Sequence, residues 1–195
     1  MSEFVNVKII VSDKQYIKYS KQVCDLIVDA AKLRGTGIAK RTPEYISSKI
    51  SDGKAVIALD GDKIVGFCYI ETWQHGKYVA NSGLIVDPNY RGQKLAIRIK
   101  RKILELSNHK FPEAKVFGIT TSNVVLNINF KLGYKPVTFS ELTTDPDFWN
   151  GCKGCVNYDI LQRTDQKMCL CTGMIYDATV EEQSYEEKAS LKSNA

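Results

Sequence analysis

The chain has 195 residues, a formal net charge of +5, 44% hydrophobic residues and 25% charged residues. This length suits a single domain with one sizeable core, the mild basic excess gives no reason to expect nucleic-acid binding, and no apolar stretch is long enough to cross a bilayer. The N-terminal residues lack the charged-then-apolar pattern of a signal peptide, so we expect a cytoplasmic protein with free thiols or a metal site rather than disulfides.

The first quarter of the chain predicts a strand and two helices. Residues 5–11 read as the strand, and Ser12 or Asp13 can cap a helix over residues 14–33, whose apolar positions keep helical spacing. Thr42 before a proline predicts the start of a second, short helix that ends near residue 50. The loop between the two helices is rich in glycine and in basic residues.

The middle of the chain predicts three strands and a helix. Strands over 55–59 and 64–72 flank an Asp-Gly-Asp turn, which favours a hairpin, and a third strand covers 79–86. Residues 94–106 predict a helix with an apolar face opposite a basic one.

The last part predicts a strand over 115–120, a helix over 123–132 that ends at a glycine, and a closing hairpin of 156–161 with 168–176. We expect one domain over residues 1–177. The chain then becomes polar and acidic, so we expect a disordered tail over 178–195.

The passage from residue 84 to residue 96 carries the clearest functional signal. An apolar strand leads through a proline turn into Arg91-Gly92-Gln93, and a helix follows. The start of a helix has unpaired backbone N–H groups and the positive end of the helix dipole, so a glycine turn before it makes a site for a phosphate or pyrophosphate group.

This passage and the order of elements around it resemble the GNAT (Gcn5-related N-acetyltransferase) superfamily, over nearly the whole chain to residue 177. The pyrophosphate turn of that family, Arg/Gln-x-x-Gly-x-Gly/Ala, corresponds to residues 91–96, with Lys94 in place of the usual Gly. A second signature, Leu-Gly-Phe/Tyr, corresponds to residues 132–134. The resemblance implies an α/β (α+β) fold with a mixed, mostly antiparallel sheet of about seven strands and about four flanking helices.

The same resemblance implies acetyl-CoA, or succinyl-CoA, as the acyl donor. The strand before the pyrophosphate turn would part from its neighbour and pair with the pantetheine arm, which Asn123 could also contact. The backbone of the turn would hold the pyrophosphate. The residues implied for the donor are Leu84, Ile85, Val86, Arg91, Gly92, Gln93, Lys94, Leu95, Ala96 and Asn123.

Acyl transfer to an amine needs a group that removes a proton, because an amine is mostly protonated near pH 7. Glu71, near the end of a central strand, is the first candidate for the base, and His75 is the second. Many GNAT enzymes use a Tyr four residues before the glycine of the second signature as the acid. Asn129 stands there, so Tyr134, Tyr90 or water would have to replace it.

The loop between the first two helices carries the candidate acceptor residues Arg34, Lys40 and Arg41. Arginine suits carboxylate recognition, and in the GNAT fold this region borders the acceptor pocket, which favours an acidic small acceptor. Four sequence segments resemble those of a Bacteroidetes-type group of amino-acid N-acyltransferases connected with arginine biosynthesis, with glutamate as the candidate acceptor. The segments begin at residues 34, 82, 120 and 148.

The cysteines Cys152, Cys155, Cys169 and Cys171 have spacings that a zinc site permits. The predicted closing hairpin would pair Cys155 with about Met174, and so would keep the four thiols apart unless residues 151–154 folded back. We therefore do not favour a zinc site, which stays open as an alternative, and we expect Cys24 and Cys68 to be core residues.

Our interpretation is an N-acyltransferase that acts on a small amine, without nucleic-acid or membrane partners, and the resemblance also implies that a homodimer can form. Two alternatives stay open. One is a protein or peptide N-acetyltransferase of the same fold, and the other is a CoA-binding sensor without catalysis.

Overall fold

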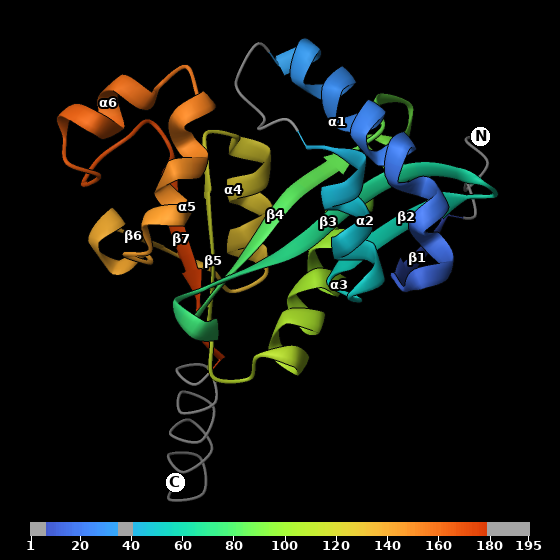
Figure 1. Ribbon diagram of the computed structural model, residues 1–195, viewed down its shortest axis with the longest axis horizontal. Helices are drawn as coiled ribbons and strands as arrows, with labels where there is room; N and C mark the ends of the chain where they lie inside the picture. The colour runs from blue at the N-terminus through green and yellow to red at the C-terminus, as the bar shows by residue number, and fades with distance from the viewer. Residues whose placement is uncertain (1–6, 35–40, 179–195) are drawn as a thin grey trace, which may run out of the picture.

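The computed structural model describes residues 7–34 and 41–178, which form one seven-stranded sheet (Figure 1). Its spatial order is β1-β2-β3-β4-β5-β7-β6, and every neighbouring pair is antiparallel except β4 with β5. The strands are β1 (Lys8–Val11), β2 (Ala55–Asp60), β3 (Lys63–Trp73), β4 (Tyr78–Val86), β5 (Lys115–Thr120), β6 (Lys135–Val137) and β7 (Thr172–Tyr176). The predicted mixed, mostly antiparallel sheet of seven strands is confirmed.

Six α-helices accompany the sheet within the described ranges, two more than predicted. They are α1 (Ser20–Arg34), α2 (Pro43–Ser51), α3 (Leu95–Lys110), α4 (Asn123–Lys131), α5 (Pro146–Asn150) and α6 (Tyr158–Arg163). Short 3-10 turns are η1 (Lys14–Tyr19), η2 (Gln74–Gly76), η3 (Pro88–Tyr90), η4 (Phe139–Glu141) and η5 (Gly151–Gly154). The helix predicted over 14–33 therefore begins as a 3-10 turn, capped by Asp13.

The sheet is buried on both faces. On one face α3 packs against Val56, Val65 and Ile70. On the other face α1 and α2 pack against Ile57 and Phe67. Successive strand residues point to opposite faces, so each central strand contributes to both cores.

A third core covers the half of the sheet formed by β5, β6 and β7. Phe117 and Ile175 contact Trp149 of α5 and Leu161 of α6 there, and Figure 1 shows both helices beside these strands. This third core lies on the same face of the sheet as α2. Ala80 belongs to this core and pairs directly with Glu71 of β3, and the side chain of Glu71 contacts Lys49 of α2. Directly paired residues share a face of the sheet.

The predicted closing hairpin is wrong. Residues 158–163 form α6 rather than a strand, and β7 pairs instead with β5 and with the short β6. Tyr158 and Leu161 face the core three residues apart, a helical spacing, whereas Val156 is 69% exposed. The spacing of the buried residues in this segment is thus that of a helix. In so short a segment, the sequence pattern of a helix cannot be told from that of a strand.

Candidate active site

The parallel strands β4 and β5 pair over three positions only. The pairs are Tyr78 with Lys115, Val79 with Val116, and Ala80 with Phe117. Beyond them β4 continues to residue 86 beside β3 alone, and β5 continues beside β7 alone. Figure 1 shows the two strands moving apart toward the top of the view. Leu84, Ile85 and Val86 therefore lie on a part of β4 that has no pairing with β5.

A β-bulge bends β4 inside this parted region. Phe67 pairs with Ile85 and Tyr69 pairs with Ser82, so three steps along β4 oppose two along β3. Gly83, in the bulge, has φ +65°, and a Cβ atom added there would lie 2.6 Å from Cε1 of Tyr69. Glycine is therefore required at this position both by its backbone conformation and by the ring packed against it.

The loop after β4 leads into α3 through two residues with positive φ. Gly92 has φ +78°, and Lys94 has φ 59° and ψ 17°, the left-handed conformation. Lys94 thus adopts the conformation for which the family pattern places a glycine, at a cost of roughly 1–2 kcal/mol. The side chain of Lys94, the N-cap residue, makes no capping hydrogen bond, and the first turn of α3 holds no acidic residue. An uncapped, positive helix start of this kind can accept a phosphate group.

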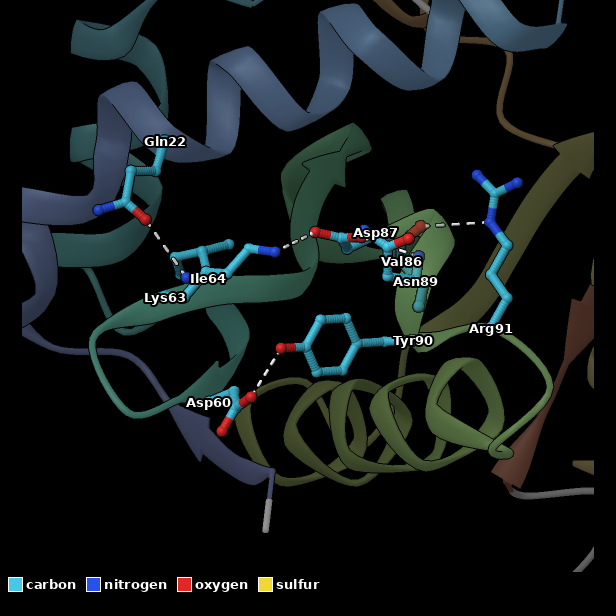
Figure 2. A network of polar contacts seen from close by, with 9 residues as sticks. All are labelled: Gln22, Asp60, Lys63, Ile64, Val86, Asp87, Asn89, Tyr90 and Arg91. Carbon is cyan, nitrogen blue, oxygen red and sulfur yellow. Dashed lines mark hydrogen bonds and ion pairs between the residues drawn. The ribbon is translucent and has the colours of Figure 1, made fainter. Parts of the chain in front are cut away.

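Contacts from the β2–β3 hairpin hold this loop in place (Figure 2). Nζ of Lys63 lies 2.8 Å from Oδ2 of Asp87, and the hydroxyl of Tyr90 donates to Oδ2 of Asp60 at 2.6 Å. Arg91 donates from Nε to the Val86 carbonyl at 3.4 Å. Figure 2 shows the two Nη atoms of Arg91 pointing away from the other labelled residues, so the guanidinium is fixed at one end and presents the other outward.

On the opposite face of the sheet, α2 and β3 bring together three charged side chains. Lys49 of α2 lies with Nζ 2.9 Å from Oε2 of Glu71 on β3. Arg41, just before α2, donates from Nε to the hydroxyl of Tyr69 at 2.8 Å. The ring of Tyr45 lies against both cations, with its centroid 5.3 Å from Cζ of Arg41 and 4.9 Å from Nζ of Lys49.

The Glu71 carboxyl group is set up to exchange a proton near neutral pH. Its side chain is only 15% exposed, and burial raises its pKa to about 7 although the nearby Arg41 charge opposes the shift. Burial also lowers the pKa of Lys49, and the charges of Lys54 and Arg41 lower it further. Oε1 of Glu71 is buried and has no hydrogen-bond partner among the described residues, which disfavours the ionised form of the carboxyl group.

The other predicted proton-transfer residues are placed elsewhere. Tyr134 is 2% exposed, lies on the α3 side of the sheet, and donates its hydroxyl to Oδ1 of Asn81 at 2.9 Å. Burial raises its pKa well above the usual value. His75 stands in η2, at the beginning of β4, whereas the loop of residues 87–94 follows the other end of that strand (Figure 1). It lines a separate hollow of about 430 Å³ with Phe111 and Glu113.

Of the predicted acceptor residues, Arg41 alone can be placed. Lys40 and the side chain of Arg34 lie outside the described residues. Asn123 is exposed at the start of α4, directly after β5. The tail predicted over 178–195 lies, beyond residue 178, outside the described part of the chain.

Three residues of the charged group escaped sequence reasoning. Tyr45 and Lys49 are four residues apart on α2, and Tyr69 is two residues before Glu71 on β3. Each pair shares a face of its element, which is the signal that could have revealed them once Glu71 and Arg41 were singled out.

A buried polar network on the α3 side was also missed. Lys100 of α3 is 2% exposed and donates from Nζ to Oδ1 of Asn81 at 3.3 Å, which Tyr134 also reaches. Nδ2 of Asn81 donates to Oγ of Ser107 at 2.8 Å. Burial lowers the pKa of Lys100 to about 8.

Asn129, at the position of the usual family Tyr, is 2% exposed and donates from Nδ2 to the Met174 sulfur at 3.6 Å. Its Oδ1 atom has no hydrogen-bond partner among the described residues. A buried carbonyl oxygen without a hydrogen-bond donor is uncommon in folded proteins.

The four C-terminal cysteines line one small cavity of about 20 Å³, contrary to the expectation that they would stand apart. The hairpin that would have separated them does not exist, and residues 151–154 turn back as η5. Across the described ranges, no three Cys, His, Asp or Glu side chains are arranged to hold a metal ion as they stand. Cys24 and Cys68 are core residues, as predicted.

The acetyltransferase (GNAT) family model matches residues 27–130. The chain belongs to this family. The matched region of the GNAT chain contains the parted strands, the pyrophosphate loop, Arg41 and Glu71, and it ends before the four cysteines. No curated protein matches the sequence significantly. Within the described residues, no helix has the length and apolarity needed to cross a membrane.

Solved structures share the GNAT fold at low sequence identity. N-acetylglutamate synthase from Neisseria gonorrhoeae, complexed with coenzyme A and N-acetyl-glutamate, has a TM-score of 0.63 at 14% identity over 90% of this chain, which spans 36% of that protein. Arabidopsis thaliana Naa50, in complex with the bisubstrate analogue CoA-Ac-MVNAL, has a TM-score of 0.54 at 15% identity over 89% of this chain and 99% of its own.

Diaminobutyrate acetyltransferase from Paenibacillus lautus, in complex with its substrate L-2,4-diaminobutyric acid and coenzyme A, has a TM-score of 0.54 at 13% identity. The likeness covers 69% of this chain and 81% of that one.

Proposed function

We propose that this protein transfers an acetyl group from acetyl-CoA to the amino group of a small acidic amine, with the α-amino group of glutamate as the first candidate. The observation that carries the proposal is the half of the site formed by Glu71, Lys49 and Arg41. It combines a carboxyl group whose pKa is about 7 with two cations, on strands and a helix next to the parted region of the sheet.

The donor half of the site fits an acyl-CoA. The free edge of β4 at Leu84, Ile85 and Val86 offers backbone groups to the amides of the pantetheine arm, in the manner of an added strand. The start of α3 offers N–H groups to the pyrophosphate, and Lys94, the N-cap residue, and Arg91, three residues before it, add positive charge. Succinyl-CoA has the same pantetheine arm and pyrophosphate as acetyl-CoA. The assay below therefore has to determine which acyl group is transferred.

Glu71 acts in this proposal as the general base. Its ionised carboxylate takes a proton from the acceptor ammonium, and the neutral amine then attacks the carbonyl carbon of the thioester. The C–N bond forms, the C–S bond breaks, and the electron pair leaves with the CoA sulfur. A thiol of this kind has a pKa of about 8.5, as in cysteine, so its thiolate leaves readily. The nitrogen gives up a second proton as the amide forms, and this proton passes through water to the thiolate.

A strong acid at the leaving group is therefore not required, which accommodates Asn129 at the usual Tyr position. Tyr134 does not take over that role in this proposal, because its hydroxyl is committed to Asn81 in the core. We assign Tyr134 to positioning: through Asn81 it holds β4 at the first residue beyond the strand pairing with β5.

An acidic acceptor follows from the cations that surround Glu71. Tyr69 holds Nε of Arg41 and so fixes the plane of the guanidinium, and a fixed guanidinium suits bidentate binding of a carboxylate. The likeness to N-acetylglutamate synthase and the resemblance to Bacteroidetes-type amino-acid N-acyltransferases support glutamate. We also propose a cytoplasmic location. We further propose a homodimer, and light scattering of the purified protein would test this oligomeric state.

The test is a thiol-release assay with the purified full-length chain. The donors are acetyl-CoA and succinyl-CoA, and the acceptors are glutamate, glutamine, aspartate, lysine and a peptide that begins Met-Val-Asn. We expect turnover with glutamate and little with the peptide. Turnover with the peptide alone would replace the proposal with a peptide acetyltransferase, which the likeness to Naa50 favours. Measurable CoA binding without turnover of any amine would indicate a sensor.

A further inference from the structure

Four thiols converge at a place that the proposed reaction does not use. Cys152 lies in η5 and Cys155 directly follows it, whereas Cys169 and Cys171 precede β7. All four are free and line one cavity with Leu161 and other residues of the third core. The cavity, at about 20 Å³, has room for a single water-sized atom.

The hydrophobic effect alone does not explain why these thiols face inward. Leu170, between Cys169 and Cys171, is 63% exposed, and Val156 and Met168 beside the two cysteine pairs are 69% and 64% exposed. Burying a Leu or Val side chain gives up to about 1.5–3 kcal/mol. The fold therefore places three large apolar side chains in solvent, while four partly buried cysteines line one cavity.

One peptide unit joins the two cysteine pairs. The backbone N–H of Asn157 donates to Sγ of Cys155 at 3.5 Å, and Sγ of Cys169 lies 3.9 Å from the Asn157 carbonyl oxygen. The N–H group directed at Cys155 stabilises its thiolate, and outer hydrogen bonds of this kind orient the ligands of metal sites. Cys169 instead donates its thiol proton to the carbonyl, a contact that metal binding would replace. The segment around them consists of η5, the six-residue α6 and loops, so it has little regular structure to hold it.

We propose that Cys152, Cys155, Cys169 and Cys171 bind one structural zinc ion in the small cavity that they share. Zinc prefers four thiolates in tetrahedral arrangement, at about 2.3 Å from each sulfur. Binding forms four Zn–S bonds and releases four protons to solvent, which leaves a net charge of −2. Lys153 lies between Cys152 and Cys155 in the sequence, and Lys167, two residues before Cys169, is paired with Asp165 at 3.7 Å.

The described side chains are not yet at the spacing that zinc requires, so binding would draw the four sulfur atoms inward by side-chain rotation. The zinc would then join η5, α6 and the approach to β7. This site would also support Phe148 of α5, whose ring packs on Trp73 at 5.6 Å and on Phe117 at 5.0 Å between ring centroids. Phe117 is the last residue of β5 that pairs with β4.

The experiment is a metal analysis of the full-length protein, purified under reducing conditions, by inductively coupled plasma mass spectrometry. We expect one zinc per chain in the wild type and in Cys24→Ala, a buried cysteine outside the cavity. Cys152→Ser and Cys171→Ser should lose most of the metal. Zinc that stays at one per chain in both serine variants would overturn the proposal.

Wild-type measurements keep the test decisive if a serine variant does not fold. Cobalt added to metal-free protein should give the charge-transfer and d–d absorption of a tetrahedral four-thiolate site, and a mercurial reagent should release the zinc as it reacts. Protein that holds no metal and gives no such cobalt spectrum, or whose intact mass shows these cysteines joined as disulfides, would contradict the proposal. Neither readout depends on acetyl transfer, so the two proposals fail separately.

Discussion

Nζ of Lys49 lies 2.9 Å from Oε2 of Glu71, so α2 and the central strand β3 are joined by a salt bridge of which each side chain is only 15% exposed. The second carboxylate oxygen, Oε1, is buried and has no hydrogen-bond partner among the described residues. This arrangement holds the proposed base in one orientation and keeps a cation next to it, where the carboxylate of an acceptor would bind.

Replacing Glu71 by Gln removes the proposed base with little change in shape. We expect kcat/KM to fall by about 10²–10⁴, the usual contribution of general base catalysis. In the wild type, kcat/KM should rise with pH through about 7 as the carboxyl group ionises, and this limb should disappear in the variant. Thiol-release rates between pH 5.5 and 9 would measure both. Glu105→Gln, on the exposed face of α3, is the control. An unchanged pH profile in Glu71→Gln would exclude the assignment.

Replacing Arg41 by Ala should weaken acceptor binding selectively. A hydrogen bond to a charged group contributes about 1.5–3 kcal/mol, so we expect the KM for glutamate to rise roughly 10- to 100-fold while CoA affinity stays unchanged. Arg41→Lys keeps the charge but not the planar donor set, and should recover only part of the loss. Steady-state kinetics and calorimetry with CoA would separate the effects, with exposed Lys32→Ala as the control. A loss confined to CoA binding would contradict the acceptor role.

Two variants at Lys94 separate backbone strain from charge. Lys94→Gly relieves the left-handed strain and should raise the free energy of unfolding by roughly 1 kcal/mol, whereas Lys94→Ala keeps the strain and should not. Both remove the cation, so both should weaken CoA binding severalfold at low salt and less at high salt. Denaturant titration and calorimetry at two salt concentrations provide the measurements. Equal stability of the two variants would show that the strain is absent.

Replacing Lys100 by Met should stabilise the protein near pH 7. Burial lowers the pKa of this lysine from 10.5 to about 8, so between these values the unfolded chain binds more protons than the folded one. Stability should therefore rise with pH from about 8 to 10.5, and below pH 8 the charged lysine costs about 3 kcal/mol. The variant should flatten that rise. Urea unfolding at pH 7 and pH 10 would test this, and a parallel pH dependence in both proteins would contradict it.

Tyr134→Phe tests whether this tyrosine supports the fold or donates a proton. Removing a hydroxyl that bonds Asn81 should lower the free energy of unfolding by about 1 kcal/mol. We expect kcat to change less than tenfold, since the hydroxyl is not directed at the reaction site. A kcat that falls by a hundredfold or more, with an altered basic limb of the pH profile, would restore Tyr134 as the acid.

The regular parts of the fold were predictable because their signals are local. Thr42 does cap α2, with Oγ1 accepting from the N–H of Tyr45, and Asp60 and Lys63 do close the β2–β3 hairpin. The segment from residue 146 to 171 was not predictable, because its helices are five and six residues long and carry too few apolar positions to define a period. The wrongly predicted hairpin also led to the wrong expectation that the four cysteines lie apart.

The candidate site was predictable only where a single element carries it. The proposed pyrophosphate loop is one continuous stretch of sequence. The loop and the replacement of the usual glycine by Lys94 could therefore both be recognised from the sequence. Lys49, Tyr69 and Glu71 come together because α2 packs against β3. The sequence of neither segment predicts that it contacts the other. Tyr134 shows the converse case, since a tyrosine in a family signature turned out to bond Asn81 in the core.

The parting of β4 and β5 places two unpaired strand edges inside the sheet rather than at its rim. Free edges recruit other extended chains and promote aggregation, and a bound pantetheine arm would cover this one. A ligand at 100 times its Kd stabilises the folded state by about 2.7 kcal/mol. We therefore expect the solubility and lifetime of this protein in the cell to follow the supply of coenzyme A, so that a shortage of the coenzyme would reduce the amount of enzyme as well as its rate.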